Sequence, residues 1–570
     1  MIHCLLVSQQ KLRTFFAFAT TKLSYFTKSA RWTRKNFIQY ICQNNPLFVH
    51  VTYFALISFA GYAALKVIKP RDKLNTLRDL DVLFTSISAS TVSSMATVEM
   101  EDFSSAQLWV LTILMLIGGD IFTSMLGIHF MRAKFGRKEP VNTRDHSSYI
   151  DIEPITSTKF NPSTQDMKVT VSFSEPHMEN EGHVEPSTIE FFGFVVMGYL
   201  LMTNLGGSLL IYLYLNLVPS AQQILKRKGI GMVIFSVFTA ISSVGNCGFT
   251  PVNENMIIFQ KNSVLLLIII PQILAGNTLF APCLRLMVWS VEKITGKKDC
   301  RYILERSKAI GYKHLMSSRE GVYLILTVVS FIIMQTVLFL SLEWNSAALH
   351  EMNSYQKIVC ALFQSVNSRH AGESITDLSN LSSAILVLYT IMMYLPGYTS
   401  FLPRNDDGDS KTKMIKERKR LLENWIFSQI SYLAIFVILI CITERESMAT
   451  DPLNFNVFSI LFEVVRQVTE IHCIECNKAL SLSLSLSFCN IIITEHLALM
   501  TDCCSAYGNV GFSVGYSCKR LLNHDAHCKD ASYGFAGKWS DSGKAILIIV
   551  MLFGRLKAFN MKGGRAWKLR

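Results

Sequence analysis

Apolar runs of about twenty residues recur along the chain and alternate with polar segments. A helix of about 20 apolar residues is long enough to cross a bilayer, so each run predicts a membrane-spanning helix. The eight runs lie at 47–68, 107–130, 190–215, 263–290, 321–342, 382–400, 425–443 and 543–559. They come in four pairs, which indicates a membrane protein built from repeated units.

A shorter apolar segment lies between the two members of every pair. Each is too short to span the membrane and ends next to a polar or glycine-containing loop. The four segments are Asp81–Ser93, Met232–Ser243, Tyr355–Val366 and Phe455–Val465. Non-helical backbone at membrane depth is tolerated where it lines a water-filled path. Four successions of helix, half-helix, loop and helix therefore predict an all-α polytopic membrane protein with a central ion-conducting pore.

Composition and charge agree with this prediction. Of the 570 residues, 50% are hydrophobic and 17% are charged, whereas soluble domains carry about a quarter charged residues. In a soluble protein the net charge of +13 would suggest nucleic acid. Here the basic residues gather in the linkers between pairs, as the positive-inside rule expects of cytosolic segments. We therefore expect the lipid bilayer as surroundings, cytosolic N- and C-termini and no nucleic-acid partner.

The polar linkers divide the chain into four repeats, A to D. The predicted order is a basic cytosolic N-terminus 1–46, repeat A 47–132, a cytosolic linker 133–188, repeat B 189–291, a basic cytosolic linker 292–319, repeat C 320–403, a basic cytosolic linker 404–423, repeat D 424–560 and a cytosolic C-terminus 561–570. No phosphate-binding loop or zinc-protease signature is present. We therefore expect neither an enzyme nor a cofactor.

The loops that follow the half-helices carry the candidate ion site. Ser-Ser-Val-Gly-Asn-Cys-Gly-Phe-Thr at 242–250 returns as Ser-Ala-Tyr-Gly-Asn-Val-Gly-Phe-Ser at 505–513. A half-helix whose C-terminus points at the membrane centre presents the negative end of its dipole to a cation, and the next loop can turn carbonyls towards the ion. Inward carbonyls need backbone angles that glycine adopts most readily. Gly248, Gly372 and Gly511 meet this need.

Ser94 takes the corresponding place in the first repeat, within Thr-Val-Ser-Ser-Met at 91–95. Its β-carbon and hydroxyl should disfavour the inward-carbonyl geometry and narrow the ring. A smaller, strongly hydrated ion such as Na⁺ could use the hydroxyl or retained water. The residues alone leave a second interpretation equally open, in which Ser94 only caps or packs.

The spacing of a phenylalanine before each loop tests the register. Phe84 and Phe238 lie ten residues before Ser94 and Gly248, and Phe363 lies nine before Gly372. In repeat D, Phe462 lies 49 residues before Gly511, and removal of 466–504 restores ten. We interpret 466–504 as an unspliced or alternatively spliced insertion. Its cluster His472-Cys-Ile-Glu-Cys476 is a weak metal motif, and Cys518 and Cys528 could form a disulfide or a metal site.

Charged residues near the loops suggest further roles. Lys544 and Arg555 lie in or beside the last apolar run, where cations are costly. They could face the pore and repel cations as a gate or snorkel to the interface, and for Lys544 we expect snorkelling. Glu254 and Asp102 lie just beyond loops two and one, where we expect them to collect cations at the outer mouth.

At these motifs the chain resembles the plant high-affinity potassium transporter (HKT) family, relatives of the bacterial Trk and Ktr potassium-uptake subunits. The resemblance runs from about 51 to 569, is interrupted at 466–504, and rests on six specific motifs, one of which is Pro-Val-Asn-Glu-Asn at 251–255. The other five are Thr-Val-Ser-Ser-Met at 91–95, Gly-Asn-Cys-Gly-Phe at 245–249, Asn-Ser-Arg-His-Ala-Gly-Glu at 367–373, Gly-Asn-Val-Gly-Phe at 508–512 and Gly-Lys-Trp-Ser-Asp-Ser-Gly-Lys at 537–544.

The resemblance implies four membrane–pore-helix–membrane repeats around a central, potassium-channel-like pore. The implied selectivity filter, the sole Na⁺ site, consists of Ser94, Gly248, Gly372 and Gly511. The residues expected to flank it are Val92, Ser93, Asn246, Cys247, Asn367, Arg369, His370, Asn509 and Val510. By analogy with the family, Pro396 and Gly397 would form a constriction below the filter, and Arg555 is the further gate candidate.

In function, a serine at the first filter position resembles the sodium-selective branch of the family. The implied role is passive Na⁺ uptake across the plasma membrane, in the service of Na⁺ homeostasis and salt tolerance. Two alternatives stay open, a Na⁺/K⁺ co-transporter or K⁺ transporter, and a non-conducting splice product caused by the insertion. Family likeness also leaves a homodimer open.

Overall fold

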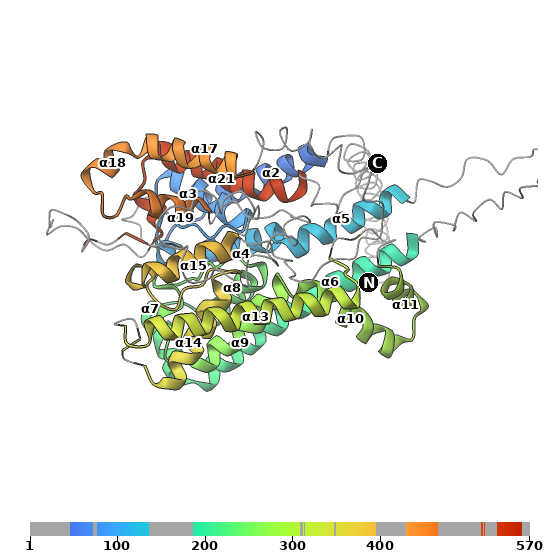
Figure 1. Ribbon diagram of the computed structural model, residues 1–570. Helices are drawn as coiled ribbons and strands as arrows, with labels where there is room; N and C mark the ends of the chain where they lie inside the picture. The colour runs from blue at the N-terminus through green and yellow to red at the C-terminus, as the bar shows by residue number, and fades with distance from the viewer. Residues whose placement is uncertain are drawn as a thin grey trace, which may run out of the picture.

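The computed structural model describes residues 46–71, 77–135, 186–307, 312, 314–346, 349–350, 352–394, 429–465, 513, 515–516, 518 and 533–560. Every regular element in these ranges is a helix. Figure 1 shows most of the long helices running side by side in one bundle. The expected all-α architecture is confirmed for this part of the chain.

Helices occupy all eight predicted apolar runs as far as the structure describes them. The first helices of repeats A to D are α2 (Pro46–Val67), α6 (Pro186–Leu217), α13 (Ser318–Glu343) and α17 (Gln429–Thr443). The second helices are α4 (Ser105–Gly118) with α5 (Asp120–Phe135), α9 (Ser263–Gly276) with α10 (Phe280–Thr295), α15 (Ser383–Tyr394) and α21 (Asp541–Asn560). Among the described helices, three are long and apolar enough to cross a membrane, or up to six if each bent pair counts as one span.

Two of the second helices are broken, although runs 107–130 and 263–290 predict continuous spans. The axis bends by 51° between α4 and α5 and by 87° between α9 and α10. Glycine accompanies both breaks, as it often does in sharp helix kinks. A β-carbon on Gly118 would lie 1.9 Å from the Ser90 carbonyl oxygen, and one on Gly276 would lie 1.9 Å from the Val244 carbonyl oxygen. Each second helix therefore bends where it meets the end of a pore helix.

The four predicted half-helices are present as pore helices. They are α3 (Asp79–Ser90), α8 (Met232–Gly245), α14 (Ser354–Asn367) and α19 (Val457–Val465). The phenylalanines that set the register, Phe84, Phe238, Phe363 and Phe462, are all 0% exposed. A short 3₁₀ helix lies before the second helix in every repeat, and these are η1 (Met100–Asp102), η2 (Asn255–Phe259), η4 (Leu378–Asn380) and η7 (Phe535–Lys538).

Contacts between repeats close the bundle into a ring. The second helix α4 of repeat A packs against pore helix α8 of repeat B, and α9 of repeat B packs against α14 of repeat C. The α15 helix of repeat C packs against α19 of repeat D, and α21 packs against α2 and α3 of repeat A. Each pore helix is therefore held between its own repeat and the preceding repeat of the ring.

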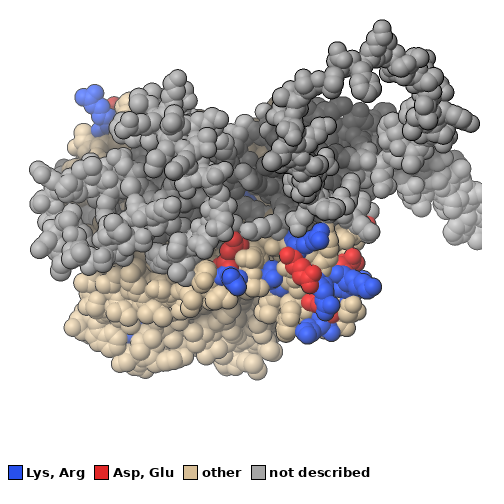
Figure 2. All heavy atoms as spheres, turned by 45° about the vertical axis from the view of Figure 1, so that its right-hand side comes forward, with Lys and Arg blue, Asp and Glu red and all other residues tan. Residues whose placement is uncertain are grey.

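Among the described residues, three short helices lie outside the predicted pattern. They are α7 (Pro219–Lys228), α11 (Lys298–Glu305) and α18 (Arg445–Thr450). Their sequences are polar, so a search for apolar runs does not find them. Figure 2 shows that charged side chains gather at one end of the described surface, where α10 and α11 lie, while the broad lower face is almost free of charge. A wide uncharged face is what a lipid-facing surface requires.

In each of repeats C and D, a buried carboxyl group joins the end of the first long helix to the start of the second. Glu343, at the end of α13, accepts a hydrogen bond from the backbone N–H of Ser382 (2.8 Å). Glu444, just after α17, accepts from the backbone N–H (3.0 Å) and the hydroxyl (2.6 Å) of Ser540. Each acceptor meets the N-terminus of a second helix, where the helix dipole favours a negative group.

Candidate functional site

The loops after pore helices α3 and α8 share one backbone conformation. Left-handed φ angles occur at Val92 (59°) and Ser94 (56°) in repeat A and at Asn246 (55°) and Gly248 (84°) in repeat B. The filter candidate and the residue two positions before it are thus left-handed in both loops. Each loop is closed by a hydrogen bond to the pore helix, with Ser93 N–H donating to the Ser88 carbonyl (2.8 Å) in repeat A.

Serine is accommodated in this geometry despite its β-carbon. Ser94 adopts the left-handed conformation of its glycine counterpart, at a strain of about 1–3 kcal/mol for a residue with a β-carbon. The surrounding bonds hold it there, since the Ser88 hydroxyl accepts from the backbone N–H of Met95 (2.7 Å) directly after the filter candidate. A serine in place of glycine thus adds side-chain atoms at this position without changing the path of the backbone.

The third loop is one residue shorter than the first two, and its filter candidate also has a left-handed backbone. Gly372 has a φ of 79°, and its N–H donates to the Asn367 carbonyl (3.2 Å). The Asn367 side-chain oxygen accepts from the backbone N–H of Glu373 (3.0 Å). Asn367 therefore supports the loop of repeat C as Ser88 supports that of repeat A.

Three of the four filter candidates meet in space. A β-carbon on Gly248 would lie 1.9 Å from the Ala371 carbonyl oxygen and 3.2 Å from the Ser94 hydroxyl oxygen. Ser94 thus points its hydroxyl at the loop of repeat B, which in turn touches the residue before Gly372. The fourth candidate, Gly511, lies outside the described residues, as do the flanking Asn509 and Val510 and the insertion 466–504.

The described flanking residues are buried in the scaffold behind the loops. The Arg369 guanidinium lies over the Phe331 ring of α13, 4.9 Å from its centroid. The His370 Nε2 atom lies 3.5 Å from the Thr278 hydroxyl at the break between α9 and α10. Cys247 is 0% exposed, and the Ser93 hydroxyl bonds the hydroxyl of Thr91 (2.8 Å). These side chains hold the loops in place.

Arg555 fills the break in the second helix of repeat A. Its guanidinium donates to the Gly118 carbonyl and lies 2.5 Å from the Asp120 carboxylate. It also lies over the Phe54 ring, 5.5 Å from the centroid. Arg555 is 4% exposed, so the structure places this cation inside the bundle. The other gate candidates, Pro396 and Gly397, lie outside the described residues.

The expectation that Lys544 snorkels was wrong. Lys544 is 3% exposed, and its Nζ forms an ion pair with Asp81 Oδ1 of pore helix α3 (2.8 Å). A second, exposed ion pair joins Arg78 and Asp541 (2.5 Å) along the same junction. A carboxylate partner within the bundle removes the need for the ammonium to reach water. Lys544 therefore ties repeat D to repeat A.

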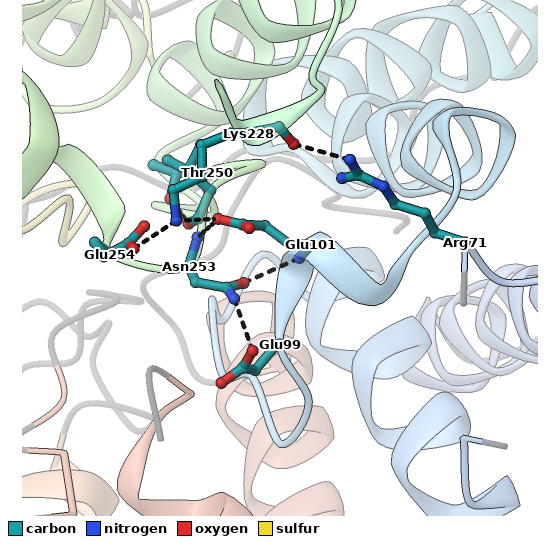
Figure 3. A network of polar contacts seen from close by, with 8 residues as sticks. Arg71, Glu99, Glu101, Lys228, Thr250, Asn253 and Glu254 are labelled. Atoms are coloured by element: carbon teal, nitrogen blue, oxygen red, sulfur yellow. Dashed lines mark hydrogen bonds and ion pairs between the residues drawn. The ribbon is translucent and has the colours of Figure 1, made fainter. Parts of the chain in front are cut away.

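Glu254, expected to collect cations at the outer mouth, is paired with a lysine in the structure. Figure 3 shows Lys228, at the end of α7, between two carboxylates, with Nζ 2.9 Å from Glu101 and 2.5 Å from Glu254. Asn253 bridges the same loops, since its side-chain amide donates to Glu99 (2.8 Å). The Lys228 ammonium thus partly neutralises both carboxylates. The Asp102 carbonyl accepts from the N–H of Arg71 (3.0 Å), and its N–H donates to the Glu99 carbonyl (3.2 Å).

Among the described residues, no group of three or more His, Cys, Asp or Glu is placed to hold a metal ion. Of the two cysteines considered after the last filter loop, Cys518 is disulfide-bonded and Cys528 lies outside the described residues. The cluster at 472–476 also lies outside them.

Comparison with known proteins places the chain in a family. A family model described as TrkH, cation transport protein, matches residues 167–402. The cation transporter HKT1;3 of Oryza sativa subsp. japonica is 78% identical over 570 residues, which cover 100% of both chains. The chain belongs to the HKT cation transporters. The sodium transporter HKT1 of Arabidopsis thaliana resembles this HKT chain at 44% identity, over 89% of this chain and 92% of that protein.

A solved structure resembles the HKT chain as well. The potassium transporter TrkH from Vibrio parahaemolyticus covers 90% of this chain and 83% of its own, with a TM-score of 0.47 and 14% identity. Membership in the HKT family makes the chain a multi-pass membrane transporter of cations and not an enzyme.

Sequence reasoning missed Glu373 and Lys228 as members of the site. Glu373 directly follows a filter glycine, and an acidic residue at membrane depth is itself a signal of function. Lys228 ends a short polar helix, and the sequence offers no sign that it meets Glu101 from another repeat. Its role becomes visible only once the ring is assembled.

Proposed function

We propose that this transporter conducts Na⁺ passively across the plasma membrane through a filter formed by Ser94, Gly248, Gly372 and Gly511. The observation that carries the proposal is the convergence of the first three loops, with the Ser94 hydroxyl 3.2 Å from the site of a β-carbon on Gly248. The pore helices add the negative ends of their dipoles, which favour a cation. The Arabidopsis relative, which is called a sodium transporter, agrees with this choice of ion.

Sodium is favoured over potassium by the chemistry of the ring. Potassium-channel filters replace the hydration shell of K⁺ with rings of backbone carbonyls. Ser94 keeps the left-handed backbone but adds a β-carbon and a hydroxyl, so one quarter of the ring is narrower and offers a hydroxyl oxygen. A smaller ion that retains some of its water fits such a ring better. For a plant, such uptake would serve Na⁺ homeostasis and salt tolerance.

Below the filter, Arg555 serves as the gate candidate. Its guanidinium is buried among Gly118, Asp120 and Phe54. A cation next to the conduction path raises the barrier for another cation, and the Asp120 carboxylate offsets part of that charge. Movement of Arg555 between the break and the path would change the barrier to conduction.

Ion-substitution electrophysiology on Ser94→Gly tests the proposal. We expect Ser94→Gly to admit K⁺, because it removes the side-chain atoms that narrow the ring. A tenfold rise in the K⁺:Na⁺ permeability ratio would move the reversal potential by about 59 mV. Ser94→Ala is the matched variant, which should lose Na⁺ current without gaining K⁺ because the β-carbon remains. Wild-type ion ratios in Ser94→Gly would refute the proposal.

The same recordings need the version that lacks 466–504 beside the full chain. The insertion separates pore helix α19 from the last filter loop, so the short version gives the filter its regular spacing in repeat D. We expect Na⁺ current from the short version. Absence of current from both versions would contradict the proposal.

A further inference from the structure

The third filter loop rests on repeat B. Glu373 directly follows Gly372 and is 0% exposed. Its Oε1 atom accepts a hydrogen bond from the Ser243 hydroxyl (2.6 Å). Ser243 belongs to pore helix α8 and lies five residues before Gly248. A single hydrogen bond thus connects the end of one pore helix to the filter loop of the next repeat.

Two further contacts with repeat B lie on either side of Gly372. On one side, the Ala371 carbonyl oxygen lies so close to Gly248 that a β-carbon there would be 1.9 Å away. On the other side, the Ser374 carbonyl accepts from the backbone N–H of Met256 (3.1 Å) in repeat B. The chain is therefore held by repeat B immediately before and soon after Gly372. This junction therefore fixes the backbone on both sides of Gly372.

An acidic residue at this position distinguishes repeat C from the other described loops. The residue after the filter candidate is Met95 in repeat A and Phe249 in repeat B. The second carboxyl oxygen of Glu373, Oε2, is buried and has no hydrogen-bond partner among the described residues. A buried acceptor left without a partner is unfavourable, so simple packing does not explain a glutamate here.

We propose that Glu373 is a positioning residue for ion discrimination, which fixes the Gly372 carbonyl against repeat B through its hydrogen bond from Ser243. This inference rests on the proposed filter function. It assigns the discriminating geometry to a junction between two repeats as well as to the side chain of Ser94.

Three variants separate the hydrogen bond from the charge. Ser243→Ala removes the donor, Glu373→Asp shortens the acceptor, and Glu373→Gln keeps an acceptor oxygen of the same reach without the charge. We expect Ser243→Ala and Glu373→Asp each to change the K⁺:Na⁺ permeability ratio at least threefold, a reversal-potential shift of about 28 mV. Two substitutions that remove the same hydrogen bond do not have additive effects. The double variant Ser243→Ala/Glu373→Asp should therefore show no further shift of the reversal potential. Glu373→Gln should keep the wild-type ratio.

Thr239→Val is the matched control. Thr239 lies one turn before Ser243 on α8, is 0% exposed, and has a hydroxyl without a hydrogen-bond partner among the described residues. Its loss should leave the permeability ratio unchanged. Currents are normalised to surface expression, so that a folding defect lowers the current without moving the reversal potential.

The outcomes distinguish this inference from the proposed function. A wild-type ratio in Ser243→Ala, in cells where Ser94→Gly admits K⁺, overturns the role of Glu373 alone. A changed ratio in Ser243→Ala with an unchanged one in Ser94→Gly supports the role of Glu373 and contradicts the serine filter. An altered ratio in Glu373→Gln that exceeds that in Ser243→Ala assigns the effect to charge and overturns the hydrogen-bond role.

Discussion

Replacing Gly118 with alanine is expected to displace the end of a pore helix. The new β-carbon would lie 1.9 Å from the Ser90 carbonyl oxygen, whereas such contacts become ordinary at 3.4 Å, so α4 and α3 must separate by about 1.5 Å. The obstructing atom is backbone, and no side-chain rotation relieves the clash. Overpacking of this kind destabilises by about 1–3 kcal/mol. Because Ser90 lies four residues before Ser94, we also expect a reduced Na⁺ current.

The adjacent glycine provides the control. A β-carbon on Gly119 would lie 3.3 Å from the nearest atom, the Met115 carbonyl oxygen, so Gly119→Ala requires almost no movement. Its φ of −63° is also accessible to alanine. Thermal unfolding of the purified proteins and current per surface molecule should separate the two variants. Equal behaviour of Gly118→Ala and Gly119→Ala would refute the reasoning about the close contact.

Two further predictions concern stability. Lys544→Met should destabilise the protein by about 3–5 kcal/mol, because it leaves Asp81 buried without its cation. Asp541→Asn breaks the exposed ion pair with Arg78 and should cost under about 1 kcal/mol. Similar melting temperatures for the two variants would count against a stabilising role of the buried pair. Val92→Asn should lower the melting temperature, although asparagine tolerates the left-handed φ of 59°. Val92 is 2% exposed within the hydrophobic core, and the lost apolar burial together with an unpaired buried amide outweighs about 1–3 kcal/mol of relieved strain; a higher melting temperature would contradict that explanation.

The helices could be predicted because apolar length is a direct requirement of the bilayer. Runs such as 190–215 and 321–342 coincide with α6 and α13, and the short segment at 232–243 coincides with α8. The filter candidates could be proposed because glycine and its spacing from a buried phenylalanine are visible in the sequence. Both signals are local and repeat along the chain.

Features that depend on contacts between repeats could not be predicted. The breaks after Gly118 and Gly276 arise where the end of a pore helix meets a second helix, a contact that the sequence of the second helix does not record. Lys544 was expected to reach water because its partner Asp81 lies 463 residues away. The hydrogen bond between Ser243 and Glu373 likewise joins two repeats and leaves no pattern in either one.

Ser94 stands in only one of four loops that share a single polypeptide. A channel assembled from four copies of a short subunit has to carry the same side chain four times around its axis, so one codon change would introduce four hydroxyls together. A gene that encodes all quarters in tandem can alter one of them and leave three untouched. Evolution can then change the side chain at one of the four positions at a time, which a homotetramer cannot do.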